Sequence, residues 1–502
     1  MSKKNQNYTN RKQNRFQPER MHGNVFVNNS GKQWLPGENG RAAKVERLLR
    51  GTKEEKKEIT GNMAGYKDSG VEWIGAIPKG WKVKRLKYAL TSIRNGASDA
   101  AVEYSPELPR YVRITDIDDN GHLKQTGKQY LPKELAKNFI LDKKAVLIAR
   151  VGNLGKAMLF DPDKENEVCA LSGYLIEAIT NPKVMNSKFL FYFIKSSAYM
   201  DWANRNFVQT TIQNLSAGRH KNLPVTLPPL PEQQRIADFL DTKCSILDRT
   251  IDAVSRQIED LEKYKKALIT KTVTKGICKK GEPERAMKDS GVEWIGEVPE
   301  EWSVKRLKYV LNSIRNGAPA AAVEYSPELP RYVRITDIDD NGRLKETGKQ
   351  SLPKDIAKRY MLDKEAVLIA SVGSLGKTML FNPDTEKEKC AFAGYLIEAV
   401  TNPEAMNSKF LFYFIKSNAY MDWANRNFVQ TTIQNLSAGR HKNLPVTVPP
   451  LAEQQQIADY LDEKCKNIDD RVQKRRQQLE WLKEYKKSLI FDYVTGKKRV
   501  EK

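Results

Sequence analysis

The stretch KDSGVEWIG occupies residues 67–75 and returns unchanged at residues 288–296, an offset of 221 positions. The same offset relates Trp73 to Trp294 and Tyr264 to Tyr485, and no insertion or deletion interrupts the register between them. Residues 100–121 are identical to residues 321–342, and residues 198–226 are identical to residues 419–447. Two copies with so long a period predict a duplicated pair of domains rather than a solenoid.

Each copy divides into a mixed part and a helical part. In the first copy, VLIA (residues 146–149) and YLIEAI (residues 174–179) are typical of short buried strands. Residues 186–207 predict one helix with aromatic side chains on its buried side. The helical part opens at PPLPEQQRIADFLD (residues 228–241), where prolines end the preceding strand and Glu232 suits a first helical turn.

The helical parts carry an apolar seam with alternating spacings of four and three, which predicts a coiled coil. The seam residues are Leu247, Ile251, Val254, Ile258 and Leu261 in the first copy, and Ile468, Val472, Leu479 and Leu482 in the second, where Arg475 replaces Val254. Each helical part holds roughly 40 residues, or about 60 Å of helix. Two unrelated surface helices explain the pattern less well, because both parts share one register.

The predicted fold class is therefore α+β, with two mixed α/β domains and two long helical parts. The expected boundaries place the domains at residues 67–230 and 288–451, helical spacers at 231–276 and 452–502, and a linker at 277–287. Residues 1–66 form an N-terminal arm, of which residues 1–60 hold 14 Lys and Arg against 6 Asp and Glu. Their richness in Asn, Gln and Gly predicts a mostly disordered basic arm with one short helix at residues 42–49.

The formal charge of +23 and pI near 9.5 favour a polyanionic partner, nucleic acid before an anionic membrane. A merely basic soluble protein is the alternative. Five cysteines without a CxxC pair indicate neither a zinc site nor a disulfide framework, which fits a reducing cytoplasm. No apolar stretch approaches the length of a membrane span, and the N-terminus lacks the apolar segment of a secretory signal.

Three patterns suggest catalysis or metal binding and fail on detail. VGNLGK (residues 151–156) and VGSLGK (372–377) lack the first glycine of a phosphate-binding P-loop, where Arg150 and Ser371 stand instead. A glycine turn that presents Lys156 and Lys377 to DNA phosphate is one interpretation, and a hairpin turn with a solvated lysine is the other. ITDIDDNG (114–121) predicts an Asx-rich turn rather than a calcium loop. The histidines offer no metal-ligand spacing, and no DPPY or NPPY sequence of a methyltransferase occurs.

Residues 206–224, NFVQTTIQNLSAGRHKNLP, combine amides, threonines and basic side chains that can read base edges or hold phosphates. The alternative is a polar loop whose amides cap its own backbone. The candidate DNA-contacting residues of the first copy are Arg94, Asn95, Arg110, Arg113, Arg150, Asn153, Lys156, Gln209, Thr210, Thr211, Gln213, Asn214, Arg219, His220 and Lys221. Those of the second copy are Arg315, Asn316, Arg331, Arg334, Ser374, Lys377, Gln430, Thr431, Thr432, Gln434, Asn435, Arg440, His441 and Lys442.

Several motifs occur together in each copy: EWIGxxPxxW, a strand leading into GxLGK, and TTIQNLS before LPVTxPPLxEQQxIAxxLD. With EYKKSLI (484–490) and YVTGK (493–497), they resemble the specificity subunit of type I restriction-modification systems over residues 67–497. The resemblance implies two target-recognition domains, related by a pseudo-two-fold axis, that each read one half of a split DNA site. It also implies that the two helical spacers pair antiparallel and act as a ruler between them.

The resemblance further implies a cytoplasmic bacterial protein without catalysis of its own, which binds double-stranded DNA and no cofactor. Two methyltransferase subunits would carry S-adenosylmethionine, and restriction/translocase subunits would use ATP and magnesium. The basic arm and the likeness of the two recognition domains depart from the family pattern. Because the candidate segments are nearly identical, the expected DNA site is near-palindromic. The alternative is a stand-alone DNA-binding or regulatory protein that recruits no enzyme.

Overall fold

The computed structural model describes residues 65–99, 101–103, 105–206, 214–277, 281, 285–384, 386, 388–427 and 436–500. The expected N-terminal arm, with its short helix at 42–49, lies outside these residues except at its last two positions. The chain falls into two units, Met1–Lys82 and Val83–Lys502. In the described part of the first unit, β1 (Tyr66–Asp68) pairs antiparallel with β2 (Ala76–Pro78).

In the second unit, the mixed part of copy one, called the first domain, is built around a four-stranded antiparallel sheet. Its order is β4-β9-β6-β7, and β5 pairs separately with β8 in parallel. The elements of copy one are β3 (Lys82–Arg85), η2 (Leu86–Ala89), β4 (Leu90–Asn95), β5 (Arg110–Val112), η3 (Ile114–Asp116), α3 (Lys133–Ala136), β6 (Ala145–Ala149), β7 (Ala157–Phe160), η4 (Pro162–Lys164), β8 (Cys169–Leu171), β9 (Leu175–Thr180), α4 (Ser187–Ile194), α5 (Ser197–Asn206), α6 (Ala217–His220) and β10 (Pro224–Leu227).

The mixed part of copy two, called the second domain, repeats this plan. Its central sheet has the order β14-β21-β18-β19, and a second sheet, β15-β17-β16-β20, contains the parallel pair β16 and β20. Two further antiparallel pairs are β11 with β12 and β13 with β22. The elements are β11 (Met287–Asp289), β12 (Glu297–Pro299), β13 (Ser303–Arg306), η5 (Leu307–Tyr309), β14 (Leu311–Asn316), β15 (Val323–Glu324), β16 (Arg331–Val333), η6 (Ile335–Asp337), β17 (Gln350–Ser351), α8 (Lys354–Ala357), β18 (Val367–Ala370), β19 (Thr378–Leu380), β20 (Cys390–Phe392), β21 (Leu396–Thr401), α9 (Ser408–Ile415), α10 (Asn418–Asn427), α11 (Ala438–His441) and β22 (Pro445–Val448).

The central strands are apolar throughout because both faces of the sheet are covered. In β18, Val367 and Ile369 belong to a core that contains α9 and the ends of both long helices. Leu368 and Ala370 belong to a different core, which includes residues of β16 and β20. Successive side chains of a strand point to opposite faces, so a strand with two buried faces reads as an unbroken apolar run. The buried strands predicted from the sequence are confirmed.

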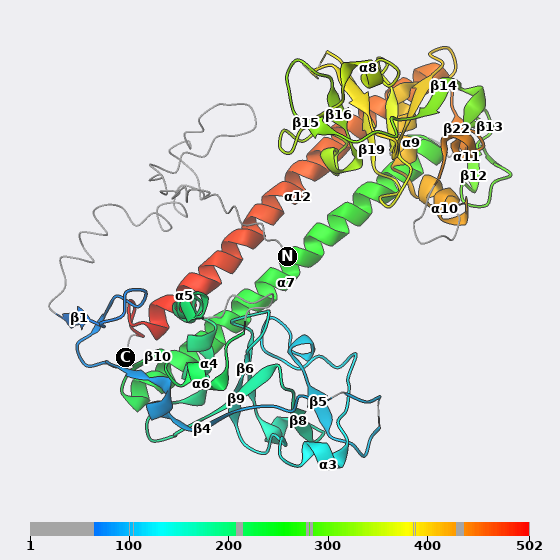
Figure 1. Cartoon of the computed structure of the whole chain (residues 1–502). Helices are drawn as coiled ribbons and strands as arrows, with labels where there is room; N and C mark the ends of the chain where they lie inside the picture. Colours follow the sequence, from blue (N-terminus) through cyan, green and yellow to red (C-terminus); the bar gives the residue numbers. More distant parts are fainter. Residues whose placement is uncertain are drawn as a thin grey trace, which may run out of the picture. The chain divides into compact units, whose positions relative to one another are not determined.

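Two long helices, α7 (Leu230–Lys275) and α12 (Leu451–Val494), pack against each other in opposite directions (Figure 1). The direction follows from three cross-helix ion pairs: Asp248 with Lys486, Glu262 with Arg476, and Lys265 with Asp469. Between the helices lies an apolar cluster that contains every residue of the predicted seam. Arg475, where copy one has Val254, donates to Gln478 Oε1 on its own helix. The antiparallel coiled coil is confirmed.

Each domain also receives the end of the helix that follows the other domain. The Thr226 hydroxyl, in the first domain, donates to the Val494 carbonyl at the end of α12 (2.5 Å). The Thr447 hydroxyl, in the second domain, donates to the Val273 carbonyl near the end of α7 (2.6 Å). The same contact is therefore made twice with the copies exchanged, as a pseudo-two-fold relation requires. The expected fold class is confirmed.

Two local predictions were wrong. The segment 186–207 forms two helices, α4 and α5, because the Ser196 hydroxyl donates to the Phe193 carbonyl (2.6 Å) and accepts from the Tyr199 amide (3.4 Å). This competes with continuation of the helix, and Ser417 repeats it in copy two. The strand expected from Tyr174 begins instead at Leu175, after a turn.

Candidate nucleic-acid interface

Four chain segments meet at one end of the central sheet of the first domain, and we call this surface the loop edge. They are residues 95–97, 150–156, 172–174 and 214–217. The Arg150 amide donates to the Tyr174 carbonyl (3.1 Å), and the Leu215 amide donates to the Arg150 carbonyl (2.8 Å). The Ala97 amide donates to the Leu171 carbonyl (2.9 Å), just before the third segment. Backbone bonds therefore fix the four segments relative to one another.

The second domain has the corresponding loop edge at residues 316–318, 371–377, 393–395 and 436–438. Its backbone bonds match: the Ser371 amide donates to Tyr395, and the Leu436 amide donates to Ser371. One side chain differs in role. Arg150 Nη1 donates to the Gly173 carbonyl (3.1 Å) and its Nε to Asn214 Oδ1 (3.4 Å), whereas the Ser371 hydroxyl donates to the Tyr395 carbonyl (2.9 Å).

Glycines make the loop edge possible. A Cβ on Gly96 would lie 2.3 Å from the Ser172 carbonyl oxygen, so no larger residue fits there. The hairpin between β6 and β7 turns through Gly152 (φ 71°) and Gly155 (φ 85°), both in the left-handed region. VGNLGK therefore forms a hairpin turn with two left-handed glycines, which both sequence interpretations include.

Eight of the candidate residues that the structure describes are exposed to solvent. They are Asn95, Asn153, Arg219 and Lys221 in the first domain, and Asn316, Ser374, Arg440 and Lys442 in the second. Arg219 Nη1 donates to the Asn206 carbonyl, which holds its side chain over the end of α5. The Lys221 carbonyl accepts from the Lys87 amide (3.1 Å), so a further basic residue lies beside it.

Other candidates are partly buried. Arg150 and Asn214 bond to each other within the loop edge, as described above. The Lys156 side chain is 12% exposed, and its ammonium lies 3.9 Å from an Asp119 carboxylate oxygen. Lys377 in copy two is also partly buried. These side chains have less freedom to reach DNA than the exposed set.

Arg94 and Arg113 connect segments of the first domain. Arg94 bonds to the buried Glu177 carboxylate and to the carbonyls of Asn138 (2.6 Å) and Ile140 (2.9 Å). Arg113 bonds to Asp116, which raises the pKa of its guanidinium. Their counterparts Arg315 and Arg334 make the same contacts in copy two, to Glu398 and Asp337.

Arg110 and Arg331 are buried, at 0% and 2% exposure. Arg110 pairs with Glu167 (3.0 Å) and donates to the Lys124 carbonyl (2.5 Å). Arg331 lies 3.5 Å from the Glu388 carboxylate and donates to the Lys345 carbonyl. Because these guanidiniums face protein groups in the interior, we leave them out of the interface.

His220 and His441 are also buried, each at 0% exposure. His220 Nδ1 lies 3.0 Å from the Ser216 carbonyl and Nε2 lies 2.9 Å from the Tyr199 hydroxyl, and His441 repeats both contacts. Burial lowers the pKa of both imidazoles to about 4. The geometry fits a neutral ring that donates to the carbonyl and accepts from the tyrosine.

The amide- and threonine-rich candidates lie outside the described residues. They are Gln209, Thr210, Thr211 and Gln213 in copy one, and Gln430, Thr431, Thr432, Gln434 and Asn435 in copy two. In both copies the described chain resumes within the loop edge, at Asn214 and at Leu436. The undescribed segment is therefore joined to the loop edge in each copy.

Sequence reasoning missed one pair of surface residues. Tyr174 and Tyr395 are 63% and 67% exposed, although each lies within a tight turn that backbone hydrogen bonds hold in place. The sequence YLIEAI placed Tyr174 inside a buried strand. The preceding glycine, in SGY and AGY, is the signal that the strand starts one residue later.

The described residues do not assemble a metal centre. No group of three or more His, Cys, Asp or Glu side chains in the described ranges could hold a metal ion. Asp118 Oδ1 accepts from the amides of Asn120 (2.9 Å) and His122 (2.8 Å), which confirms the Asx turn expected from ITDIDDNG. Among the helices of the described ranges, none is long and apolar enough to cross a membrane.

The fold and the paired loop edges define a duplicated recognition scaffold: two like domains on one antiparallel helical spacer. Residues 78–263 and 299–480, well over half of the chain, match the family model "Type I restriction modification DNA specificity domain". The chain therefore belongs to the family of type I restriction-modification specificity subunits, which are non-catalytic.

Individual relatives agree with this assignment, and one solved structure has a similar fold. The MjaVIII specificity subunit of Methanocaldococcus jannaschii is 24% identical over 436 residues, covering 85% of this chain and 94% of the relative. The EcoKI specificity subunit of Escherichia coli strain K12 is 22% identical over 406 residues, covering 78% and 83%. A solved structure described as "Structural basis underlying complex assembly and conformational transition of the type I R-M system" has a TM-score of 0.62 at 17% identity, covering 83% of this chain and 98% of that one. It supports the fold.

Proposed function

We propose that this specificity subunit reads a bipartite, near-palindromic DNA site, with one half-site for each domain. The observation that carries the proposal is the repetition of one loop edge in two domains that exchange helix ends. Protein two-fold symmetry imposes matching symmetry on DNA, so like domains read the same half-site on opposite strands. Residues 209–221 and 430–442, the central candidate segments, are identical in sequence.

Within each interface, the exposed basic residues hold phosphates and the amides read base edges. Arg219 and Lys221, with their copy-two counterparts Arg440 and Lys442, are the proposed phosphate contacts. Replacing Arg219 and Lys221 by Ala is expected to weaken binding to all sequences. It should also reduce the slope of log affinity against log salt by about 1 for each lost contact.

The chain itself supplies recognition, and partner subunits supply chemistry. We propose that two methyltransferase subunits carrying S-adenosylmethionine dock on it, together with restriction/translocase subunits that use ATP and magnesium. The named relatives are subunits of type I restriction enzymes, which supports such an assembly. Pull-down of the full chain is expected to recover methyltransferase in a two-to-one ratio. A chain that recruits no enzyme would instead be a stand-alone DNA-binding protein.

Mapping the methylated positions in a host that carries this system tests the site itself. The expected result is a pair of half-sites in inverted orientation, separated by a nonspecific spacer of fixed length. Two unrelated half-sites would overturn the symmetry argument, because near-identical loop edges cannot discriminate between unrelated sequences.

A further inference from the structure

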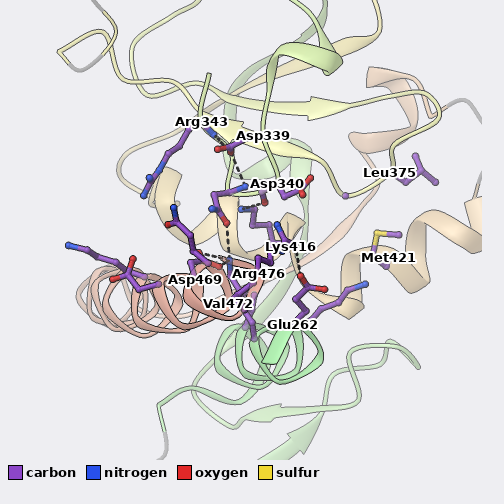
Figure 2. A pocket seen from close by; sticks show the side chains of 18 residues that line it. Glu262, Asp339, Asp340, Arg343, Leu375, Lys416, Met421, Asp469, Val472 and Arg476 are labelled. Carbon is purple, nitrogen blue, oxygen red and sulfur yellow. Dashed lines mark hydrogen bonds and ion pairs between the residues drawn. The ribbon is translucent and has the colours of Figure 1, made fainter. Parts of the chain in front are cut away.

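A polar cluster joins the second domain to both long helices at the edge of a cavity of about 850 Å³ (Figure 2). Lys265 of α7 bonds both carboxylate oxygens of Asp469 on α12 (2.6 and 2.7 Å) and also Asn341 Oδ1 in the second domain (3.2 Å). Beside it, Lys416 Nζ donates to the Asp340 carbonyl (3.3 Å). We call this cluster a lysine junction.

The first domain has the same junction with the two helices exchanged. Lys486 of α12 bonds Asp248 of α7 and Asn120 Oδ1 of the first domain (3.2 Å). Lys195 Nζ donates to the Asp119 carbonyl (2.7 Å). In each junction the lysine comes from the helix that follows the other domain. Each domain is therefore tied through one ammonium to the contact between the helices.

The loop that receives the lysine is held close to its own domain. Gly121 and Gly342 follow the two asparagines and adopt φ angles of 91° and 85°. A Cβ at Gly121 would lie 2.8 Å from the Ala157 carbonyl and 3.0 Å from the Phe191 ring. The loop that carries each asparagine is therefore packed against its own domain, and the bond to the junction lysine connects the helices to that packed loop.

The junction charges are largely withdrawn from water. Side-chain exposure is 16% for Lys265 and 28% for Asp469, and 15% for Lys486 and 20% for Asp248. Burial also lowers the pKa of Lys195 to about 8, with a contribution from the nearby Lys486. Burying an ion pair gains little stability over a packed apolar pair, so a specificity role explains its presence better. The apolar seam already joins the helices.

The sequences of the two helices support this reading. Between residues 245–256 and 466–477, one residue is shared at equivalent positions: Asp248, which corresponds to Asp469. It is the aspartate that accepts from the junction lysine, and both lysines lie in the shared sequence YKK, at residues 264–266 and 485–487. Surrounding positions have changed while the junction has kept its chemistry in both copies.

We propose that the two lysine junctions are positioning sites that set the angle of each domain on the helical spacer. They thereby fix the spacing of half-sites that the complex accepts. The inference rests on the proposed bipartite site and adds the residues that determine its geometry. The asparagines contact neither DNA nor a reacting group in this proposal, and they act through the orientation of the domain.

The test uses the Asn120→Ala/Asn341→Ala double variant in the complete methyltransferase complex. It removes the hydrogen bond between each domain and the junction lysine but leaves both Lys–Asp pairs and the seam in place. Methylation is compared on duplexes with the native spacer and with spacers one base pair longer and shorter. We expect the preference for the native spacer to fall on the order of tenfold, because small misplacements of a reacting group cost rate steeply. The half-site bases should stay unchanged.

Two matched controls separate positioning from general damage. Arg476→Met removes the cross-helix pair with Glu262, whose side chains are 58% and 48% exposed, and should leave spacer preference as in the parent. The single Asn341→Ala variant, which keeps one junction, should give an intermediate loss of preference and serves if the double variant does not fold. An unchanged spacer preference in a folded Asn variant overturns this inference alone. If the parent complex methylates no bipartite site, the proposed function fails first, and the inference with it.

Discussion

The two copies of the duplication differ in sequence along the spacer helices but are nearly identical in the loop edges. In the middle of α7 and α12 the two copies share little beyond the junction aspartate, whereas residues 95–97 and 214–217 are identical to 316–318 and 435–438. The helices pack on each other, so a seam position needs only an apolar residue of suitable size. A loop edge that meets an external surface needs particular atoms at particular places. The two copies are therefore identical over most of the loop edge and differ along the middle of the spacer.

The loop edges of the two copies differ at only a few positions. At the positions of Arg150 and Asn153 in copy one, copy two has Ser371 and Ser374. The pair Leu171–Ser172 against Phe392–Ala393 also differs, but all four are buried. Apart from that pair, the two described loop edges differ within the hairpin, at residues 150–156 and 371–377.

The largest effect is expected from shortening the diverged region. Deleting residues 251–257 together with 477–483 removes two turns from opposite positions of both helices and keeps the seam in phase. The loss of about 10 Å of helix corresponds to about 3 base pairs. Modification of the native site should disappear and reappear at sites with a spacer shorter by that amount. Methylation mapping measures this, and an unchanged spacer in a variant with native helix content would remove the ruler role.

The second prediction concerns two residues that are identical in the two copies but lie in the interior. His220 and His441 are identical but buried and neutral, with pKa values near 4. Between about pH 6.5 and 4 the unfolded chain binds protons that the folded chain does not, so stability falls as pH drops through that window. Between pH 7 and pH 5 the expected loss is about 2 kcal/mol for each histidine.

Urea unfolding at pH 7 and pH 5 measures this dependence. His220→Gln and His441→Gln should each weaken it, whereas His122→Gln should not, since the His122 side chain is 77% exposed. Equal stability of the parent protein at both pH values would mean that the two imidazoles titrate in the folded protein as they do in the unfolded chain, which contradicts the lowered pKa values.

The third prediction concerns the exposed tyrosines that both loop edges share. Tyr174→Ala and Tyr395→Ala should each weaken binding by about 0.5–1.5 kcal/mol, the usual net contribution of one hydrogen bond, because an exposed tyrosine hydroxyl can contact the DNA backbone. The salt slope should stay the same, because no charge is lost. Tyr264→Ala, at a 58% exposed position on α7, is the matched control. Equal losses at all three positions would show that exposure alone does not identify a contact.

The smallest effect is confined to one base pair. Arg150→Ser makes the two hairpins alike at that position, so any asymmetry between the half-sites should vanish there. A bidentate arginine contact discriminates by about 1–3 kcal/mol, which sets the expected change in preference. Selection of bound sequences from a randomised half-site gives the measurement. If the asymmetry survives the substitution, Arg150 contacts no base and only bonds to Gly173 and Asn214 within the domain.

Patterns with a strong physical period could be predicted from the sequence. The buried strands, the seam and the start of α7 after its prolines follow from apolar spacing and backbone chemistry. The break at Ser196 could not be foreseen, because the aromatic pattern continues across it and the deciding hydroxyl bond is local. Tyr174 was misplaced for a similar reason, since an aromatic residue before an apolar run is typical of a strand.

The candidate site was harder to predict than the fold. Residue type suggested Arg110 and His220 as contacts, but type does not reveal burial, and both lie in the interior. The partners of Arg94, at Glu177, Asn138 and Ile140, are far from it in sequence. The lysine junctions depend on residues from three elements and had no sequence signal until the two helices were aligned with each other.

The exchange of helix ends also has a consequence for folding during synthesis. Thr226 and Val494 are 268 positions apart, while Thr447 and Val273 are 174 apart and the helix end precedes the domain. The core of the second domain contains residues of α12 up to Cys465, so it can close before the chain is finished. The core clusters within the first domain are translated first, but the bond from Thr226 forms only after the last turn of α12 has been made. A chain that stalls before residue 494 therefore lacks this contact between the first domain and α12.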